Sequence, residues 1–304
     1  MAARNTLPVL NPGTPVLARP DHRVHVGSDP RTALVLEIAP TVTINTLVAV
    51  LQRLRTPQRF MHVRRAVRAS GLTVTAFWAI VDRLVDAGKA VEPPTTRPRP
   101  FHVGVTGHGE LAGLLLTELP RNGHRAFPFD PAMLFRSGGP RPHLVVLSDQ
   151  PVADPALWEP LVAASVPHLT VHVDNDIGTV GPLVLPGLSS CLHCLDLHRA
   201  DLDPHWPLLA ATLHGVSGAG SPATRQATAA VAAAQITEIT DRLRARTADP
   251  PSITGRILEF RPSPSTVTSL PAPVHLRCVC RSTDGEAHGL QPSTILDHAA
   301  KGLN

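Results

Sequence analysis

The sequence predicts an α/β fold: a Rossmann-like domain that carries four clustered cysteines, preceded by a small winged-helix domain. Three observations lead to this prediction. An apolar strand, a Gly-rich turn and a helix follow one another over residues 101–119. Two short cysteine pairs stand far apart in the second half of the chain. A hairpin pattern and three helical patterns come before a Pro-rich stretch.

The chain of 304 residues is long enough for two domains. We expect residues 1–20 to be a flexible arm because they are Pro-rich, and residues 21–92 to form the winged-helix domain. Residues 93–100, PPTTRPRP, read as a stiff linker. The α/β domain then covers residues 101–285, and residues 286–304 form a tail that resembles nothing familiar.

The first domain is predicted as two strands, three helices and a closing strand. RVHVG and TALVLE form a hairpin because SDPR between them supplies turn residues. Helices follow in TINTLVAVLQRL, in PQRFMHVRRAVRASG, which ends at Gly71, and over residues 72–87. The last helix begins at Thr73 or Thr75 as N-cap, and KAVE closes the domain as a strand.

The second domain alternates strands with helices, which is typical of a parallel sheet. After the first strand, turn and helix, we expect strands in HRAFPFD, HLVVLSD and HLTVHVD, with a helix in PALWEPLVAASVP before the last of them. VGPLVLPG leads to the first cysteine pair, a long Ala-rich helix covers residues 225–246, and ITGRILEFRP is a late strand.

Composition limits the function classes. The sequence has no apolar run of the roughly 18 residues that a membrane span needs, and its start lacks the apolar core of a signal peptide, so we expect a cytoplasmic protein. Residues 1–100 carry 14 Lys+Arg and 6 Asp+Glu, a net charge of +8, whereas residues 101–304 have a net charge of −4. A basic first domain attracts acidic partners, either nucleic acid or an acidic peptide.

Cys191, Cys194, Cys278 and Cys280 are the four cysteines of the chain. Two short chelating pairs that are distant in sequence suit a structural, tetrahedral zinc site made of four thiolates. A redox role would use only CxxC and leave the second pair without a function, and unliganded thiols are the third alternative. If zinc takes all four thiolates, no cysteine is left as a nucleophile.

Gly107, Gly109 and Ala112 form a GxGxxA turn between a strand and a helix, the context that nucleotide binding requires. Asp130 follows 23 residues after Gly107, where an acid that binds ribose would stand. A tight βα turn without any nucleotide explains the same glycines equally well.

The residues after CLHC offer a second site, since His198 and Asp203 could perform acid–base chemistry. The structural alternative, which we favour, is a salt bridge between Arg199 and Asp203 on one helix, with Trp206 filling the core.

The order of strand, GxGxxA, helix, Asp-ended strand, GPLVLPG, CLHC and late CVC resembles the ThiF-like, ubiquitin-activating-like superfamily. The string CLHCLDLHRADLDPHWP is more specifically similar to the ThiF-like branch of azole-forming peptide biosynthesis, whose members are cyclodehydratase or leader-peptide-binding components. Residues 21–92 resemble the winged-helix peptide clamp that such proteins carry. The resemblance covers roughly residues 21–285.

The resemblance implies ATP and magnesium, with Gly107, Gly109, Ala112 and Asp130 at the nucleotide and Asp149 near the metal ion. This chain departs from the pattern because residues 101–280 contain no lysine. Arg136 and Arg141 are the substitutes at hand for the missing phosphate-binding charge. We therefore expect a degenerate ATP site, which argues against independent adenylation and leaves enzymatic activity open.

The leading hypothesis is a component that binds a precursor leader peptide and recruits a YcaO-type cyclodehydratase, with a homodimer implied by resemblance. Six arginines (Arg53, Arg55, Arg59, Arg64, Arg65 and Arg68) could form a basic rim for the peptide, or simply a solvated helix face. The alternatives are an active adenylating enzyme, a winged-helix DNA-binding regulator and a dehydrogenase. Helix 72–87 is poor in residues that read bases, which disfavours nucleic acid, and a dehydrogenase leaves the four cysteines unexplained.

Overall fold

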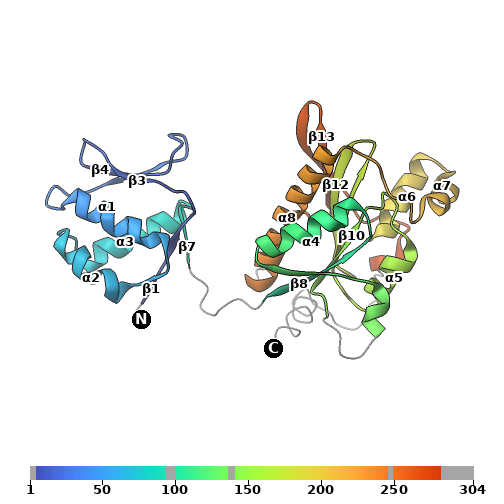
Figure 1. Cartoon of the computed structure of the whole chain (residues 1–304), viewed down its shortest axis with the longest axis horizontal. Coiled ribbons are helices and arrows are strands. Elements are labelled where there is room, and N and C mark those ends of the chain that lie inside the picture. The colour runs from blue at the N-terminus through green and yellow to red at the C-terminus, as the bar shows by residue number, and fades with distance from the viewer. Residues whose placement is uncertain (1–4, 93–99, 136–140, 246–248, 282–304) are drawn as a thin grey trace. The chain divides into compact units, whose positions relative to one another are not determined.

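The computed structural model describes residues 5–92, 100–135, 141–245 and 249–281 (Figure 1). The chain divides into two compact units, residues 1–98 and 99–304. The expected tail, residues 286–304, lies outside the described residues. In the part of the chain that the structure describes, no helix combines the length and apolar character needed to cross a membrane.

The N-terminal unit contains a three-stranded antiparallel sheet with the order β3-β4-β5. Its strands are Val16–Ala18, Arg23–Val26 and Leu34–Glu37. The predicted hairpin is therefore confirmed as β4 and β5, paired from Arg23↔Glu37 to Val26↔Leu34.

Residues 5–20 differ from the expected arm, because they belong to the body of this unit. Strand β1 (Thr6–Leu7) pairs with β6 (Gln58–Arg59), and β2 (Val9–Leu10) pairs with β7 (Ala90–Val91). Leu7, Leu10 and Val16 are 0%, 2% and 1% exposed. Proline content suggested flexibility, but the apolar residues between the prolines find partners far along the chain.

Three helices complete the core of this unit: α1 (Ile44–Gln52), which packs against β3 and β4, α2 (Phe60–Ala69) and α3 (Val74–Asp86), with the short η1 (Arg53–Arg55) after α1. The hydroxyl of Thr73 accepts a hydrogen bond from the N–H of Ala76 at 3.1 Å, so Thr73, not Thr75, caps α3. Gly71 follows α2 with φ +88°, and a side chain there would also meet the carbonyl oxygen of Thr41.

The C-terminal unit is built on a sheet whose seven described strands have the order β14-β13-β12-β11-β10-β8-β9. The strands are β8 (Phe101–Thr106), β9 (His124–Pro128), β10 (Leu144–Ser148), β11 (His168–Asp174), β12 (Ile177–Val184), β13 (Arg256–Pro262) and β14 (Ser265–Pro271). The helical segments are α4 (Glu110–Arg121), η2 (Pro131–Phe135), α5 (Pro155–Ala163), α6 (Leu192–Leu202), α7 (Trp206–Leu213), α8 (Pro222–Ala245) and η3 (Val279–Arg281).

The prediction of a parallel sheet is right for one half of this sheet and wrong for the other. Strands β9, β8, β10 and β11 are parallel, whereas β11, β12, β13 and β14 pair antiparallel. The change comes at Asn175 and Asp176, which both have positive φ and join β11 to β12 as a hairpin. Asn and Asp tolerate this left-handed conformation, so the turn reverses the chain within two residues.

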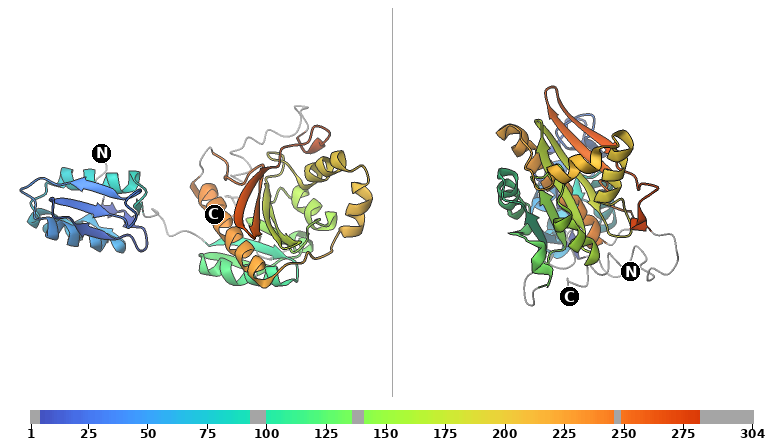
Figure 2. Two further views of the ribbon diagram at one scale, coloured as in Figure 1. Left: turned by 90° about the horizontal axis from the view of Figure 1, so that it is seen from above. Right: turned by 90° about the vertical axis from the view of Figure 1, so that its right-hand side faces the viewer.

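Both faces of the parallel half of the sheet are covered by helices, which fixes the layers of the unit there (Figures 1 and 2). Leu144 and Val146 of β10 pack into one core cluster together with α4 and α8, whereas Val145 and Leu147 pack into a second cluster with α5 and α6. This alternation follows from the two-residue period of a strand. The carboxyl ends of β8 and β10 are thereby held side by side.

Candidate functional site

The Gly-rich turn lies between β8 and α4, beside the carboxyl end of β10. Strand β8 lies between β9 and β10 in the sheet, so this is a switch point, where α/β proteins commonly bind ligands. Gly107 has φ +97°, and a side chain on it would lie 2.6 Å from the hydroxyl of Ser148 and 2.7 Å from the Asp149 carboxylate. A side chain on Gly109 would overlap the same carboxylate. Both glycines are thus needed for the close approach of Asp149.

Asp149, which the resemblance assigned to a magnesium ion, lies beside the Gly-rich turn, and its carboxylate hydrogen-bonds within that turn. The N–H of Gly109 donates to Oδ2 of Asp149 at 3.2 Å, and the hydroxyl of Ser148 donates to the same oxygen at 2.9 Å. Glu110, in the first turn of α4, pairs with Arg225 at 2.8 Å. The N-terminus of α4 therefore already has carboxylates at its positive end.

The other residues assigned to the nucleotide take different positions. Asp130 is exposed, and its carboxylate accepts the N–H of Ala132 at 2.8 Å at the start of η2. Ala112 is 2% exposed and packs α4 into the core. Arg141 is exposed, and Arg136 lies outside the described residues.

The four cysteines come together from two distant segments. Cys191 is the N-cap of α6 and Cys194 lies in its first turn, while Cys278 lies just before η3 and Cys280 lies within it. The Sγ atom of Cys191 lies 3.8 Å from that of Cys194 and 3.6 Å from that of Cys278. The Sγ atom of Cys194 lies 3.4 Å from that of Cys280. Tetrahedral bonds of about 2.3 Å to zinc place sulfurs about 3.8 Å apart. The cluster is therefore compatible with one structural metal ion.

Burial makes the thiolate form costly at two of the four cysteines unless a cation is present. It raises the pKa of Cys191 to about 12, and it also raises the pKa of Cys280. A metal ion supplies the charge that lets buried thiols lose their protons.

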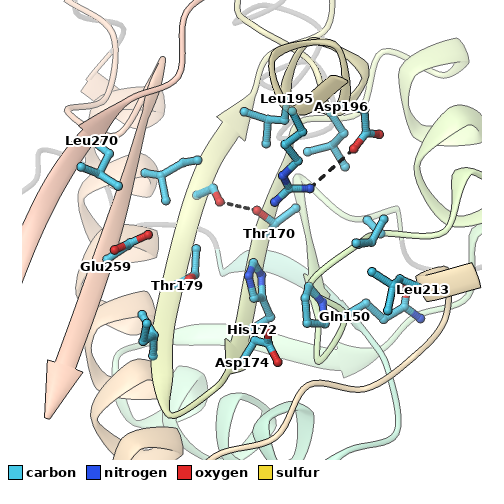
Figure 3. A pocket seen from close by; sticks show the side chains of 18 of the residues that line it. Gln150, Thr170, His172, Asp174, Thr179, Leu195, Asp196, Leu213, Glu259 and Leu270 are labelled. Carbon is cyan, nitrogen blue, oxygen red and sulfur yellow. Dashed lines mark hydrogen bonds and ion pairs between the residues drawn. The ribbon is translucent and has the colours of Figure 1, made fainter. Parts of the chain in front are cut away.

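A cavity of about 370 Å³ lies on the sheet face near α6 and α7 (Figure 3). Thr170 and His172 of β11 and Thr179 of β12 point into it, and Gln150 lies at the end of β10. Nδ1 of His172 is buried without a partner among the described residues. Burial, together with the nearby Arg199, lowers the pKa of His172 to about 4, so the ring is neutral at physiological pH.

The residues after CLHC reach this cavity in a different arrangement from the one expected. Arg199 pairs with Asp196 at 3.5 Å instead of with Asp203, whose carboxylate accepts the N–H of His205. Trp206 is partly exposed and lines the cavity, with the Arg199 guanidinium 4.8 Å from its ring centre. Sequence reasoning missed His172, in a strand, and Gln150, in the loop after β10, because residues that line a cavity leave no local signal.

The fold and these features together define a class of protein: a mixed α/β unit with a Gly-rich turn at the switch point and a four-cysteine cluster. Solved structures similar to this chain include two heterocyclases and an enzyme of microcin C7 biosynthesis. They include a heterocyclase in complex with substrate and cofactor (17% identity, TM-score 0.62, 88% of this chain and 38% of that chain). The heterocyclase TruD is 18% identical, with a TM-score of 0.59, over 88% of this chain and 41% of that chain.

The E. coli enzyme MccB, which takes part in microcin C7 biosynthesis, has the same fold over nearly its full length. In complex with N-formylated MccA it is 12% identical, with a TM-score of 0.56, over 90% of this chain and 99% of that chain. The present chain spans about two-fifths of the length of the two heterocyclases. No family model and no curated protein matches the sequence. These likenesses establish the fold.

Proposed function

We propose that this chain is the peptide-recruiting component of a pathway that modifies a ribosomally made peptide. The N-terminal unit, a winged-helix peptide clamp, binds the leader of the precursor. The C-terminal unit binds a partner enzyme. The observation that carries the proposal is the open edge of strand β5.

Strand β5 ends the three-stranded sheet, and among the described residues β4 alone pairs with it. At the other end of the sheet, the carbonyl oxygen of Val16 in β3 already accepts a hydrogen bond from the side chain of Gln52 at 3.0 Å. Leu34, the first residue of β5, and Ile38, which follows the strand, are only partly buried against the core. An extended peptide gains main-chain hydrogen bonds at such an edge and apolar contacts beside it.

Charge favours an acidic leader. The six arginines of the expected rim are all exposed, and residues 1–100 have a net charge of +8. Arg64, Arg65 and Arg68 lie on α2, which packs against α1 and α3 on the side away from β3 and β4 (Figure 1). They act on an acidic peptide through long-range attraction, which speeds encounter, more than through contacts along β5.

The partner enzyme is inferred from the greater length of the two heterocyclases. About three-fifths of each heterocyclase has no counterpart in this chain. A separate enzyme of the YcaO type, the partner that the sequence resemblance implies, would supply the missing catalytic part. The four-cysteine cluster, filled with zinc, would fasten the C-terminal cysteine pair to α6 in the unit that docks this enzyme.

The same proposal holds that this chain does not adenylate a peptide with ATP. At an effective dielectric constant of 20, two unit charges 4 Å apart repel by about 4 kcal/mol, so a phosphate at the turn would be opposed by the Asp149 carboxylate. Residues 101–280 offer no lysine to offset this repulsion. We expect no pyrophosphate exchange with ATP and the cognate peptide; exchange that Asp149→Asn abolishes would instead establish an adenylating enzyme.

The experiment begins with a native pull-down on the tagged chain and identification of captured molecules by mass spectrometry. A captured peptide is then synthesised, and hydrogen exchange is measured on the chain with and without it. Strand addition should slow exchange in residues 34–37 and leave residues 16–18 unchanged.

A scrambled peptide of the same composition separates strand addition from charge attraction. Equal protection by both peptides, or protection elsewhere than β5, would contradict the clamp. Capture of duplex DNA alone, with binding that weakens steeply as salt rises, would instead favour a DNA-binding regulator.

A further inference from the structure

A polar cluster joins α6 to the segment that carries the second cysteine pair. His198 and Asp201 stand three residues apart on α6, the helix that begins at the first cysteine pair. His275 and Arg277 immediately precede Cys278. The side chains of His198, Asp201 and His275 offer metal-ligating atoms within 4.8 Å of one another, so a second metal site is the first interpretation to test.

Hydrogen bonding argues against a metal on His275. The backbone N–H of Arg277 donates to Nδ1 of His275 at 3.1 Å, so Nδ1 carries no proton. The proton therefore sits on Nε2, which donates to Oδ2 of Asp201 at 2.8 Å. The guanidinium of Arg277 holds the other oxygen of the same carboxylate. With both ring nitrogens and both carboxylate oxygens engaged, the cluster has no free ligand pair to offer.

The same contacts fix the course of the chain toward the cysteines. His275 is 6% exposed, and its carbonyl oxygen accepts the N–H of Cys278 at 3.0 Å. The ring of His198 packs edge-on against His275 at 4.6 Å and hydrogen-bonds to the carbonyl of Pro273 at 3.1 Å. Just upstream, the hydroxyl of Ser190 donates to the carbonyl of Ala272 at 2.6 Å. Residues 272–278 are thus held against α6 by contacts that involve no sulfur atom.

We propose that Asp201 and His275 are positioning residues for the metal: they hold the Cys278–Cys280 segment against α6 in the metal-free protein, so that all four sulfurs are in place before the ion binds. The reason is entropic. Cys194 and Cys278 are separated by a long stretch of chain, so bringing the second cysteine pair to the first costs conformational entropy. Contacts that already hold the second pair in place in the metal-free protein remove this cost from the metal-binding step. Groups that orient metal ligands commonly change metal affinity 10- to 100-fold. The inference does not depend on the proposed function.

The test replaces Asp201 with alanine in the full chain and titrates the reduced, metal-free protein with Co²⁺. Cobalt bound by four thiolates absorbs in the visible range, which reports both occupancy and tetrahedral geometry. Affinity for Zn²⁺ is then measured by competition with a chromophoric chelator. Asp201 is about half exposed, so its replacement leaves the core intact. Asp203→Ala is the matched control, because it removes the same charge two residues away and has no part in the cluster.

We expect Asp201→Ala to weaken zinc binding at least 10-fold relative to Asp203→Ala, with an unchanged cobalt spectrum at saturation. Asp201→Asn, which keeps an acceptor for His275, should recover part of the affinity. Equal affinities in the two alanine variants would overturn the proposal. A tetrahedral spectrum lost at saturating cobalt would also overturn it, because Asp201 would then maintain the fold itself. If the parent chain does not bind cobalt, the proposal also fails, because there is then no metal ion for Asp201 and His275 to position.

Discussion

A substitution of Leu10 tests whether residues 5–20 are part of the N-terminal unit or form a flexible arm. Leu10 is 2% exposed and lies opposite Ala90 in the β2–β7 pair, so it joins the two ends of the unit. Leu17, in β3, is 54% exposed. Leu10→Ala and Leu17→Ala remove the same atoms from the same segment, and they differ in burial.

The magnitudes follow from that difference. Replacing a buried leucine with alanine costs about 2–5 kcal/mol, because apolar contact is lost and a cavity remains. At Leu17, where half of the side chain stays in water, we expect about 1 kcal/mol or less. Deleting residues 1–20 removes Leu7, Leu10 and Val16 together, which costs about as much as the 5–15 kcal/mol that stabilises a typical domain. The truncated unit should therefore not fold.

Trp78 provides a local assay, since it is the single tryptophan of residues 1–98 and its ring lies 5.4 Å from that of Phe60. Urea unfolding is followed by its fluorescence after Trp158 and Trp206 are replaced with phenylalanine. With an m-value of about 1.5 kcal/mol/M, a loss of 3 kcal/mol lowers the midpoint by about 2 M. If Leu10→Ala shifts the midpoint no more than Leu17→Ala, or if the truncated chain keeps the Trp78 transition, residues 5–20 do not pack as described.

Three further predictions concern the cap, a buried histidine and the metal. Thr73→Ala should cost about 1 kcal/mol in the Trp78 assay and Thr75→Ala clearly less, whereas equal losses would contradict the cap at Thr73. His168 is fully buried, and burial lowers its pKa to about 4 from 6.5. The unfolded chain therefore takes up the proton first, and His168 should contribute a loss of about 3 kcal/mol in the stability of the C-terminal unit as the pH drops from 6.5 to 4. His172, whose pKa burial also lowers to about 4, should contribute a loss of similar size. His168→Gln should therefore remove about half of the pH dependence of the urea midpoints, and an unchanged profile would show that His168 does not contribute. Elemental analysis should find one zinc ion per chain and none in Cys194→Ser, and chelation should lower the melting temperature of the C-terminal unit but not the Trp78 transition; equal thiol reactivity before and after chelation would argue against a metal.

The fold and the candidate site divide into features with a local signal and features without one. The hairpin of β4 and β5, the helices α1 to α4 and the strands from β8 to β11 all follow from apolar period, caps and turn residues in a short window. The glycines at 107 and 109 and the two cysteine pairs were visible for the same reason. Their residue types and spacing restrict what they can do.

The tertiary structure alone decided the rest, because the deciding contacts join residues far apart in sequence. Leu10 is buried by a strand that begins 80 residues later, and the antiparallel half of the sheet depends on which edge each new strand meets. The sequence put Asp149 at the end of a strand, but only the packing of β10 beside β8 placed its carboxylate in the turn that was expected to hold phosphate. Likewise, Asp201 and His275 belong to no sequence motif. Their proposed role as positioning residues follows from the fold, which places α6 next to the last cysteine pair. Local patterns determine elements and residue chemistry, whereas the partner of each side chain depends on the long-range packing that brings it there.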